Sequence, residues 1–309
     1  MKLFLTGASG LVGSNVARVA ARRGHEVTAV VGSWTGKIPG AARLLTLDLG
    51  HEPAVQHAVL DLFPDAIINC AALSSPALCE AQPQRAHDLN VALPEALAKL
   101  AHHLGARLLH LSSEQVFDGN QASPYRREDP VSPPNLYARQ KVESEHLVAK
   151  FAPDQSASVR LPLLGGNSLT GRRSFHERMF AAWAAGQKAR LYRDEIRQPC
   201  SGDNVAEMLV ELMERTDQRG VLHWAGADAL TRAEMGARVA AHFGIPAGLI
   251  DPANRTDDPG GEERQACLRL DCTPLAGTLK TRQESFDELL EKLTVPPPYR
   301  AWYAGLGAT

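Results

Sequence analysis

The sequence predicts an α/β fold in which a parallel sheet is covered by helices on both faces. Three observations predict it. Short apolar runs alternate with helical patterns up to about residue 161, a glycine-rich turn follows the first run, and the alternation weakens beyond Pro162. Alternating strands and helices fold into a doubly wound parallel sheet. The remainder of the chain is expected to form a smaller, mixed α/β C-terminal lobe.

The expected strands are short runs rich in apolar residues. They cover 3–6, 27–31, 43–47, 66–70, 106–112 and 157–161, and a run at 221–224 is expected to rejoin the sheet. Helical patterns follow at 174–186, 204–215, 231–243 and 283–293, and Thr231 with Glu234 has the spacing of a capping box. We therefore expect one domain over 1–161, joined by 218–226, and a second lobe over 162–217 and 227–309.

The glycine turn lies between the first strand and a helical pattern, and a second strand follows. It reads Thr6-Gly7-Ala8-Ser9-Gly10-Leu11-Val12-Gly13. This context is the one that a dinucleotide-binding, Rossmann-type site requires. Glycines permit a tight turn, close approach of a pyrophosphate and close packing of the helix, whose N-terminus attracts the anion. We expect the cofactor to contact Gly7, Ser9, Gly10, Leu11, Val12 and Gly13.

The residues after the second strand indicate which dinucleotide binds. An acidic residue there would bind the ribose of NAD and repel a 2′-phosphate. The segment from Val31 to Lys37 contains no Asp or Glu. Ser33 and Lys37 are suited to contact a phosphate instead. The sequence therefore predicts NADP as the preferred cofactor, with NAD as the alternative.

A serine, a tyrosine and a lysine have the spacing of a proton-transfer site. Tyr137 and Lys141 are four residues apart, so both would lie on one face of a helix that begins near Asn135. Such a pair arises by chance about one time in eight in this composition, so its context matters. An ammonium beside a phenol lowers its pKa, which suits Tyr137 to act as an acid or base. Ser113 is expected at the carboxyl end of a strand, where open sheets bind ligands.

Together these motifs make the chain similar to an extended short-chain dehydrogenase/reductase. It resembles the group typified by dTDP-4-dehydrorhamnose reductase, within the NAD-dependent epimerase/dehydratase superfamily. The resemblance covers nearly the whole chain. Besides the motifs above, it is carried by Asp48-Leu49, Asn69-Cys70-Ala71-Ala72, Asn90, the segment 112–119 and the segment 160–165.

The resemblance implies roles for individual residues. Ser113, Tyr137 and Lys141 would form the catalytic triad, supported by Asn90. A nucleotide-activated sugar would be the substrate, and reduction of its 4-keto group would be the reaction. Further cofactor contacts are implied for Asp48, Leu49, Cys70, Ala71, Ala72, Tyr137, Lys141, Leu161 and Pro162, and substrate contacts for Ser74, Ser113, Glu114, Gln115 and Tyr137.

Two departures from the resembled group leave the particular sugar open. Gln115 replaces the tyrosine of the reductase motif, and the segment 73–78 also differs. The related dehydratases carry Thr-Asp-Glu where this chain has Ser113-Glu114-Gln115, and a glutamine cannot accept a proton as a carboxylate does. A dehydratase is therefore disfavoured. A 4-epimerase remains an alternative, as does a non-catalytic NADP-binding subunit like the methionine adenosyltransferase regulatory protein, which is similar to this group.

Composition excludes several other classes of protein. The 309 residues are 44% hydrophobic and 22% charged, with a formal net charge of −2 and no basic block, so a nucleic-acid partner is not expected. No apolar run approaches a membrane span, and the first strand leaves no room for a signal peptide. The five cysteines form no Cys-x-x-Cys and the histidines lack metal spacing. We expect a cytoplasmic protein without a metal or a membrane partner.

A stripe of apolar residues gives an expectation about the oligomeric state of the protein. The stripe consists of Ala92, Leu93, Ala96, Leu97 and Leu100 at helical spacing. In the resembled family, the helices that carry Asn90 and Tyr137 commonly pair between subunits. We expect a homodimer formed through this stripe; the alternative is that the stripe only packs on the sheet.

Overall fold

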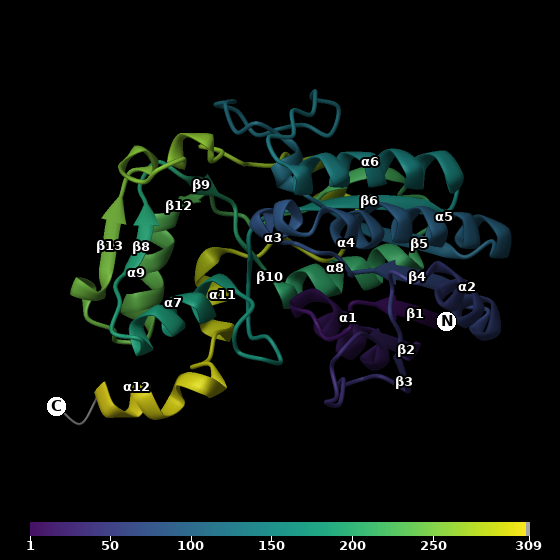
Figure 1. The fold of residues 1–309 in the computed structure, drawn as a ribbon, viewed down its shortest axis with the longest axis horizontal. Coiled ribbons are helices and arrows are strands. Elements are labelled where there is room, and N and C mark those ends of the chain that lie inside the picture. Colours follow the sequence, from purple (N-terminus) through teal and green to yellow (C-terminus); the bar gives the residue numbers. More distant parts are fainter. Residues whose placement is uncertain (307–309) are drawn as a thin grey trace.

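One lobe of the molecule, on the right in Figure 1, is built on a seven-stranded sheet in which every strand pair is parallel. This computed structural model describes residues 1–306, so the last three residues of the lobe predicted over 227–309 lie outside it. The strand order is β11-β6-β5-β4-β1-β2-β3. The strands are β1 (Lys2–Thr6), β2 (Glu26–Val31), β3 (Arg43–Thr46), β4 (Ala66–Asn69), β5 (Arg107–Ser113), β6 (Ser156–Leu161) and β11 (Gly220–His223). The predicted Rossmann-type, doubly wound parallel sheet is confirmed.

Helices cover both faces of this sheet because its strands are apolar on both sides. On one face lie α1 (Leu11–Arg22) and α8 (Gly202–Glu214), whose buried residues share one cluster with β1, β2 and β6. On the other face lie α2 (Glu52–Leu62), α5 (Leu93–Leu104) and α6 (Leu136–Phe151), which share a second cluster with β4 and β5. The switch in strand order between β1 and β4 opens a crevice at the carboxyl ends of these strands.

The apolar stripe on α5 packs inside the chain. Leu97 is fully buried, Leu93 is 3% exposed and Leu100 is 8% exposed, in the cluster that includes Ile67 of β4. The stripe is therefore part of the core and is not a subunit interface. The expectation that it forms a dimer contact was wrong. A helix that covers a sheet buries its apolar face against that sheet, so this face is not available to a second subunit.

The path into α5 contains structure that the sequence pattern did not predict. Two short helices, α3 (Pro76–Ala81) and α4 (Pro83–His87), lead into a π-helical turn, Asp88–Ala92. Each short helix begins with a proline, which suits the first helical turn. Helices of five or six residues are too short to show a period, so tertiary packing decides them.

The second lobe lies beside the sheet layer (Figure 1) and has its own apolar core. Phe180, Trp183 and Phe243 lie at its centre. The capping box predicted for α9 is present, with Thr231 and Glu234 bonded to each other's backbone N–H groups. The helices of the lobe are α7 (Phe175–Ala184), α9 (Arg232–His242), α11 (Phe286–Lys292) and α12 (Arg300–Leu306). Its strand pairs are β7 (Leu164–Gly165) and β10 (Cys200–Ser201), β8 (Ala189–Tyr192) and β13 (Ile250–Ala253), and β9 (Ile196–Arg197) and β12 (Leu230–Thr231). The short helix α10 (Thr273–Ala276) packs on the core of the sheet layer through Leu275. The helix α12 was not predicted.

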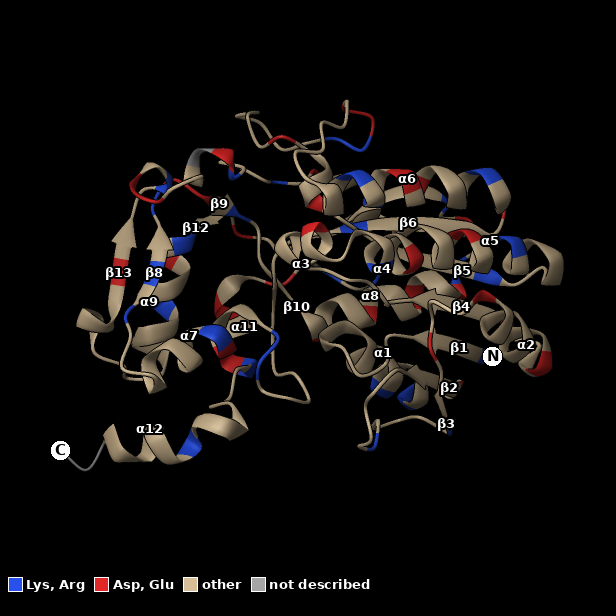
Figure 2. Ribbon diagram, viewed as in Figure 1, with Lys and Arg blue, Asp and Glu red and all other residues tan. Residues whose placement is uncertain are grey.

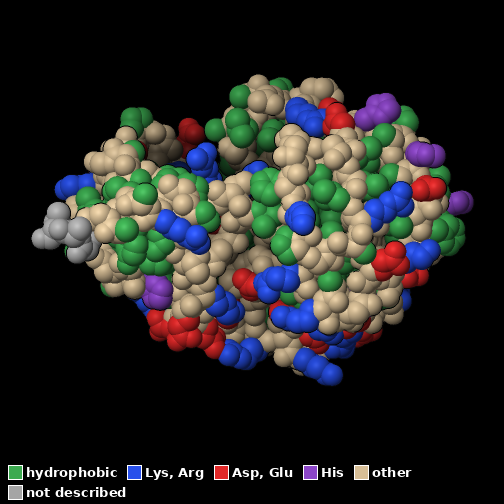
Figure 3. All heavy atoms as spheres, turned by 90° about the horizontal axis from the view of Figure 1, so that it is seen from below, with side chains coloured by type: hydrophobic (Ala, Val, Ile, Leu, Met, Phe, Trp, Pro, Cys, Tyr) green, Lys and Arg blue, Asp and Glu red, His purple; other side chains and the backbone are tan. Residues whose placement is uncertain are grey.

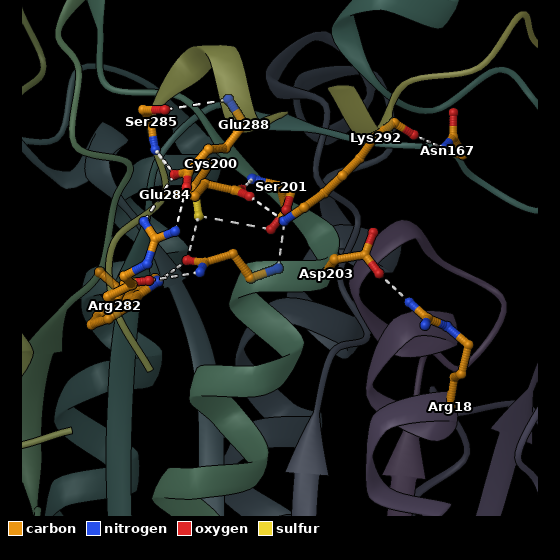
Figure 4. Close-up of polar contacts among 12 residues, drawn as sticks. Arg18, Asn167, Cys200, Ser201, Asp203, Arg282, Glu284, Ser285, Glu288 and Lys292 are labelled. Atoms are coloured by element: carbon orange, nitrogen blue, oxygen red, sulfur yellow. Dashed lines mark hydrogen bonds and ion pairs between the residues drawn. The ribbon is translucent and has the colours of Figure 1, made fainter. Parts of the chain in front are cut away.

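Buried polar contacts join the two lobes (Figure 4). The carboxylate of Glu284 accepts hydrogen bonds from the backbone N–H of Ser201 and, at 2.7 Å, from Nζ of Lys292. Ser201 caps α8, so the segment before α11 is tied to a helix of the sheet layer. The contacts of Glu284 hold the second lobe over the carboxyl ends of the strands. Within the sheet layer, the partly exposed Arg18 of α1 pairs with Asp203 in the first turn of α8.

Charged residues of both signs are interspersed over both lobes (Figure 2). On the face shown in Figure 3, hydrophobic side chains lie among charged and polar ones. Within residues 1–306, the helices are all too short or too polar to cross a membrane.

Candidate active site

A cavity of about 960 Å³ lies between the carboxyl ends of the central strands and the second lobe. It begins at the glycine turn, passes the end of β5 and the start of α6, and ends among side chains of the second lobe. Fourteen of the predicted site residues line it: Gly10, Leu11, Val12, Gly13, Cys70, Ala72, Ser74, Ser113, Glu114, Gln115, Tyr137, Lys141, Leu161 and Pro162. The structure thus brings Ser113, Tyr137 and Lys141 and the predicted substrate-contacting side chains into one space, whereas Asn90 lies outside it.

The glycine turn is packed too tightly for side chains. Gly7 has a φ of +63°, and a Cβ there would lie 2.7 Å from the backbone of Cys70 and Ala71. A Cβ on Gly13 would lie 2.3 Å from the carbonyl oxygen of Gly7. The N-cap residue of α1 is Gly10, which has no side chain, and no other described side chain accepts a hydrogen bond from the first N–H groups of the helix. The exposed N–H groups and positive end of α1 therefore face the cavity, which fits a pyrophosphate.

Several predicted cofactor contacts lie outside the cavity lining. Ser33 and Lys37 are exposed on the loop after β2, and neither has an acidic partner among the described residues. Asp48 is exposed and accepts a 2.8 Å hydrogen bond from Arg85; the Gly50 N–H and then Arg85 lower its pKa. The other predicted residues outside the lining are Gly7, Ser9, Leu49, Ala71 and Asn90.

The helix α6 carries the tyrosine and the lysine. Asn135 caps it, with Oδ1 accepting the N–H of Ala138 at 2.9 Å, as the sequence predicted. Nζ of Lys141 donates to the carbonyl oxygen of Leu111 at 2.9 Å and lies 5.9 Å from the centre of the Tyr137 ring. Ser113 ends β5 and is hydrogen-bonded to Tyr137. The three functional groups therefore meet at the carboxyl edge of the sheet.

Burial dominates the acid–base properties of this group. It raises the pKa of Tyr137 to about 12, while the hydrogen bond with Ser113 acts in the opposite direction. Burial also lowers the pKa of Lys141 to about 8. The expectation that Lys141 lowers the pKa of Tyr137 was wrong for this structure, because the ammonium is turned to the Leu111 carbonyl and the loss of water around the phenol outweighs it. Tyr137 holds its proton and Lys141 titrates near neutral pH.

Asn90 supports the site from behind the cavity. It is fully buried; its Nδ2 donates to Oε1 of Gln140 at 2.9 Å and to the carbonyl of Leu73 at 3.1 Å, while its Oδ1 accepts the N–H of Leu73 at 2.9 Å. These bonds tie the loop after β4 to α6. Asn90 therefore holds the loop after β4 against α6 and does not line the cavity.

The far end of the cavity is rich in arginine, which the sequence patterns did not reveal. Nε of Arg197 lies 3.4 Å from Oε1 of the buried Glu114, and burial raises the pKa of that carboxyl to about 8. Glu195 pairs with Arg197 at 3.3 Å and with Arg264 at 2.7 Å. The arginines that line the cavity are Arg173, Arg178, Arg197, Arg232 and Arg264. They come from separate segments of the second lobe, so no local spacing could have identified them.

Comparison with known proteins agrees with this geometry. The family model described as "RmlD substrate binding domain" matches residues 1–295. The beta subunit of methionine adenosyltransferase 2 from Xenopus laevis is 32% identical over 280 residues, 89% of this chain and 81% of that protein. A probable low-salt glycan biosynthesis reductase of Haloferax volcanii, Agl14, is 30% identical over 301 residues, 95% of this chain and 97% of that protein.

Among solved structures, a dTDP-4-dehydrorhamnose reductase from Bacillus anthracis, in complex with NADP, superimposes with a TM-score of 0.81. It is 19% identical and covers 94% of this chain and 97% of its own, so the likeness shows the fold. Fold and site together define a Rossmann-type α/β protein with a glycine turn that opens on a cavity. The chain belongs to the RmlD substrate-binding-domain family. The resemblance predicted from the sequence is confirmed.

Proposed function

We propose that this protein is an NAD(P)-dependent reductase that acts on a nucleotide-activated keto-sugar, reducing a 4-keto group. The observation that carries the proposal is the convergence of Ser113, Tyr137 and Lys141 with the glycine turn in one cavity. In this proposal 1–161 with 218–226 binds the cofactor and 162–217 with 227–309 provides the sugar site, except that α8 packs on the sheet layer.

The protein's own groups supply the proton and the orientation of the substrate. A nicotinamide cofactor, when bound at the glycine turn, supplies hydride to the carbonyl carbon. Tyr137 donates its proton to the carbonyl oxygen, so that the C=O bond becomes a hydroxyl. Ser113 donates a hydrogen bond to the same oxygen. Lys141 holds its positive charge near the phenol and stabilises the phenolate that the proton transfer leaves.

The charges of the second lobe support an anionic substrate. Five arginines line the far end of the cavity, against the carboxyl groups of Glu114, Glu195 and Glu263. Neither Arg173 nor Arg178 forms an ion pair in the described part of the chain, although the neighbouring Glu177 interacts electrostatically with Arg178. Guanidinium binds phosphate in bidentate geometry. We assign these two arginines to the diphosphate of a nucleotide sugar, and Glu114, Gln115 and Ser74 to the sugar ring.

We propose NADP as the preferred cofactor. The loop after β2 presents Ser33 and Lys37 and no carboxylate, which suits a 2′-phosphate. A charge-assisted contact contributes about 1.5–3 kcal/mol, so Lys37→Ala should weaken NADPH binding at least about tenfold and leave NADH binding unchanged. Fluorescence titration measures both, with the exposed Lys188→Ala as control. An unchanged NADPH affinity would show that Lys37 does not bind the 2′-phosphate.

A substrate screen tests the reductase proposal. Purified protein is mixed with NADPH and with 4-keto-sugars linked to dTDP, UDP, GDP or CDP, and absorbance at the nicotinamide band is followed. Stoichiometric oxidation of NADPH with one of them supports a reductase. When the corresponding 4-hydroxy sugars are supplied in place of the keto-sugars, interconversion of the two C4 epimers without net change of the cofactor would indicate the 4-epimerase instead.

A second candidate is a non-catalytic regulatory subunit. It is favoured by the 32% identity with the beta subunit of methionine adenosyltransferase 2. This hypothesis predicts that the protein binds a dinucleotide without turning over any keto-sugar. It also predicts a stable complex with a methionine adenosyltransferase catalytic subunit, measured by size-exclusion chromatography. Absence of that complex together with NADPH oxidation would exclude it.

Assembly is part of the proposal but rests on family likeness alone. We propose a homodimer that pairs through the outer faces of α5 and α6 rather than through the buried stripe. Light scattering at micromolar protein gives the mass; a monomer mass would contradict the proposal.

A further inference from the structure

A buried ion pair lies directly behind the proposed catalytic group. Glu145 on α6 is 3% exposed and Arg160 on β6 is 4% exposed. Nε and Nη2 of Arg160 donate to the two carboxylate oxygens of Glu145 at 2.9 and 2.7 Å. Burying two charges costs free energy unless their geometry and hydrogen bonding are good, so the presence of a buried ion pair at this position needs a physical explanation.

The position of Glu145 on the helix connects it to the catalytic residues. Tyr137, Lys141 and Glu145 are spaced by four residues on α6, so they lie one above another on the same face. Glu145 therefore lies one turn beyond Lys141. Its carboxylate also accepts a hydrogen bond from the Ser112 hydroxyl, and Ser112 lines the cavity beside Ser113.

The ion pair is held on its far side as well. Nη1 of Arg160 lies 3.4 Å from the carbonyl oxygen of Arg127 and 3.4 Å from Nε2 of His223, and its guanidinium lies 5.0 Å from the centre of the Phe117 ring. Burial and then Arg160 lower the pKa of His223 to about 4, so this imidazole is neutral near pH 7. The carboxylate of Glu145 is therefore fixed in place by neighbours from β5 and β6.

The other titratable groups that act on Lys141 are uncharged. Burial raises the pKa of Cys70 to about 12 and also raises the pKa of Cys79, so both thiols keep their protons. Burial lowers the pKa of His110 well below its usual value, so its imidazole is neutral. Among the described residues, Glu145 is the group that most strongly favours the charged form of Lys141.

We propose that Glu145 is a positioning residue for Lys141: its carboxylate, fixed by Arg160 and Ser112, keeps the buried lysine in the ammonium form that the proton-transfer site uses. The charge relation between the two side chains stands by itself, and only its catalytic purpose rests on the proposed function. The buried pair thus offsets the burial that would otherwise deprotonate Lys141.

The charge of Lys141 can be measured without any substrate. In protein labelled with ¹³C-lysine, the Cε signal moves as the amine loses its proton, and Lys141→Met identifies the signal by its loss. The parent should titrate near pH 8. Glu145→Gln removes the anion, so the ammonium is less favoured and the midpoint should fall by at least about one pH unit. Glu143→Gln, an exposed neighbour on the same helix, should leave it unchanged.

A second variant protects the experiment against misfolding. Glu145→Gln alone leaves a buried guanidinium unpaired, whereas Glu145→Gln with Arg160→Gln removes both charges. The midpoint of Lys141 should fall in the double variant too. An unchanged midpoint in either folded variant overturns the proposal. If neither variant folds, by circular dichroism, the ion pair serves the fold alone and the proposal is likewise overturned.

A kinetic readout separates this proposal from the proposed function. If a keto-sugar is reduced, the loss of kcat/KM at high pH should begin at lower pH in Glu145→Gln, while KM for NADPH at pH 6 stays within about twofold because the lysine is then charged in both proteins. If no keto-sugar is reduced but the lysine midpoint still falls, the reductase proposal fails and the charge relation between Glu145 and Lys141 stands.

Discussion

At the scale of single residues, burial shifts two pKa values in the site in opposite directions. The phenol of Tyr137 keeps its proton, and the ammonium of Lys141 loses its proton more easily than an exposed lysine does. Burial moves the pKa of Tyr137 up to about 12 and that of Lys141 down to about 8. A phenol with a raised pKa is fully protonated at neutral pH, which suits the direction in which a carbonyl is reduced. The same burial makes the charge of Lys141 sensitive to pH in the working range.

Removing the Tyr137 hydroxyl tests its role as the acid. Tyr137→Phe keeps the ring and should lower kcat about 10²–10⁴-fold, because general acid catalysis contributes that much. NADPH affinity and the melting temperature should change little. Tyr125→Phe is the matched control: it also removes a hydroxyl from a buried ring, but outside the cavity lining. If Tyr137→Phe retained the turnover of the parent, the four-residue spacing of Tyr137 and Lys141 would be a chance occurrence and would not mark a proton-transfer site.

The pH profile of the reaction should have a limb near pH 8. Below the pKa of Lys141 the ammonium is present, and above it the charge is lost, so kcat/KM for reduction should fall as pH rises through about 8. Burial also raises the pKa of Glu114 to about 8, so this carboxyl is the competing assignment. Lys141→Arg should move the limb to higher pH, whereas Glu114→Gln should leave it in place. The opposite pattern would assign the limb to Glu114.

At the scale of elements, the start of α1 depends on the absence of side chains. The turn closes on itself, with the Gly10 N–H bonded to the carbonyl of Gly7 at 2.9 Å. The helix that follows then presents its N-terminus to the cavity. The helix α6 starts in a different way, from an asparagine cap, and its first turn carries Tyr137.

A methyl group at Gly13 should open the glycine turn. The added Cβ would lie 2.3 Å from the Gly7 oxygen, so backbone must shift. Gly13→Ala should weaken NADPH binding at least tenfold and cost about 1–3 kcal/mol of stability, as overpacking does. Fluorescence titration and urea denaturation measure the two effects. Gly248→Ala, where a Cβ meets no atom within 4 Å, should change neither; a cofactor affinity unaffected in Gly13→Ala would argue against the turn as the phosphate site.

At the scale of the whole molecule, the cavity exists because the chain crosses between lobes several times. It leaves the sheet after β6, returns with α8 and β11, and leaves again through β12 and α9. The arginine-rich wall and the wall that carries Ser113, Tyr137 and Lys141 therefore come from different lobes. The lobes are held together by buried polar contacts such as that of Glu284 with Ser201.

The buried stripe on α5 gives a prediction about the whole molecule. Leu97→Ala should lower the free energy of unfolding by about 2–5 kcal/mol, because a fully buried leucine leaves a cavity. It should leave the mass in light scattering unchanged. Leu78→Ala is the control, since this leucine is 45% exposed. Dissociation of an assembly without loss of stability would restore the stripe as an interface.

The sequence by itself determined the features that depend on neighbours within one element. The glycine turn, the spacing of Tyr137 and Lys141 and the asparagine cap before them are local patterns, because steric limits and helical geometry act over a few residues. The parallel sheet followed from alternation along the chain. Even the position of Ser113 at a strand end was predictable, since strand length limits where a run must stop.

Tertiary structure alone decided what depends on residues far apart in the chain. It put the α5 stripe against the sheet, left Asp48 exposed beside Arg85, and gathered Arg197, Arg232 and Arg264 around the far end of the cavity. It also reversed the expected direction of the Tyr137 pKa shift. The physical reason is the same in each case: burial is a property of the packed molecule, and the removal of water, which sets both apolar packing and the cost of charge, cannot be read from a local pattern.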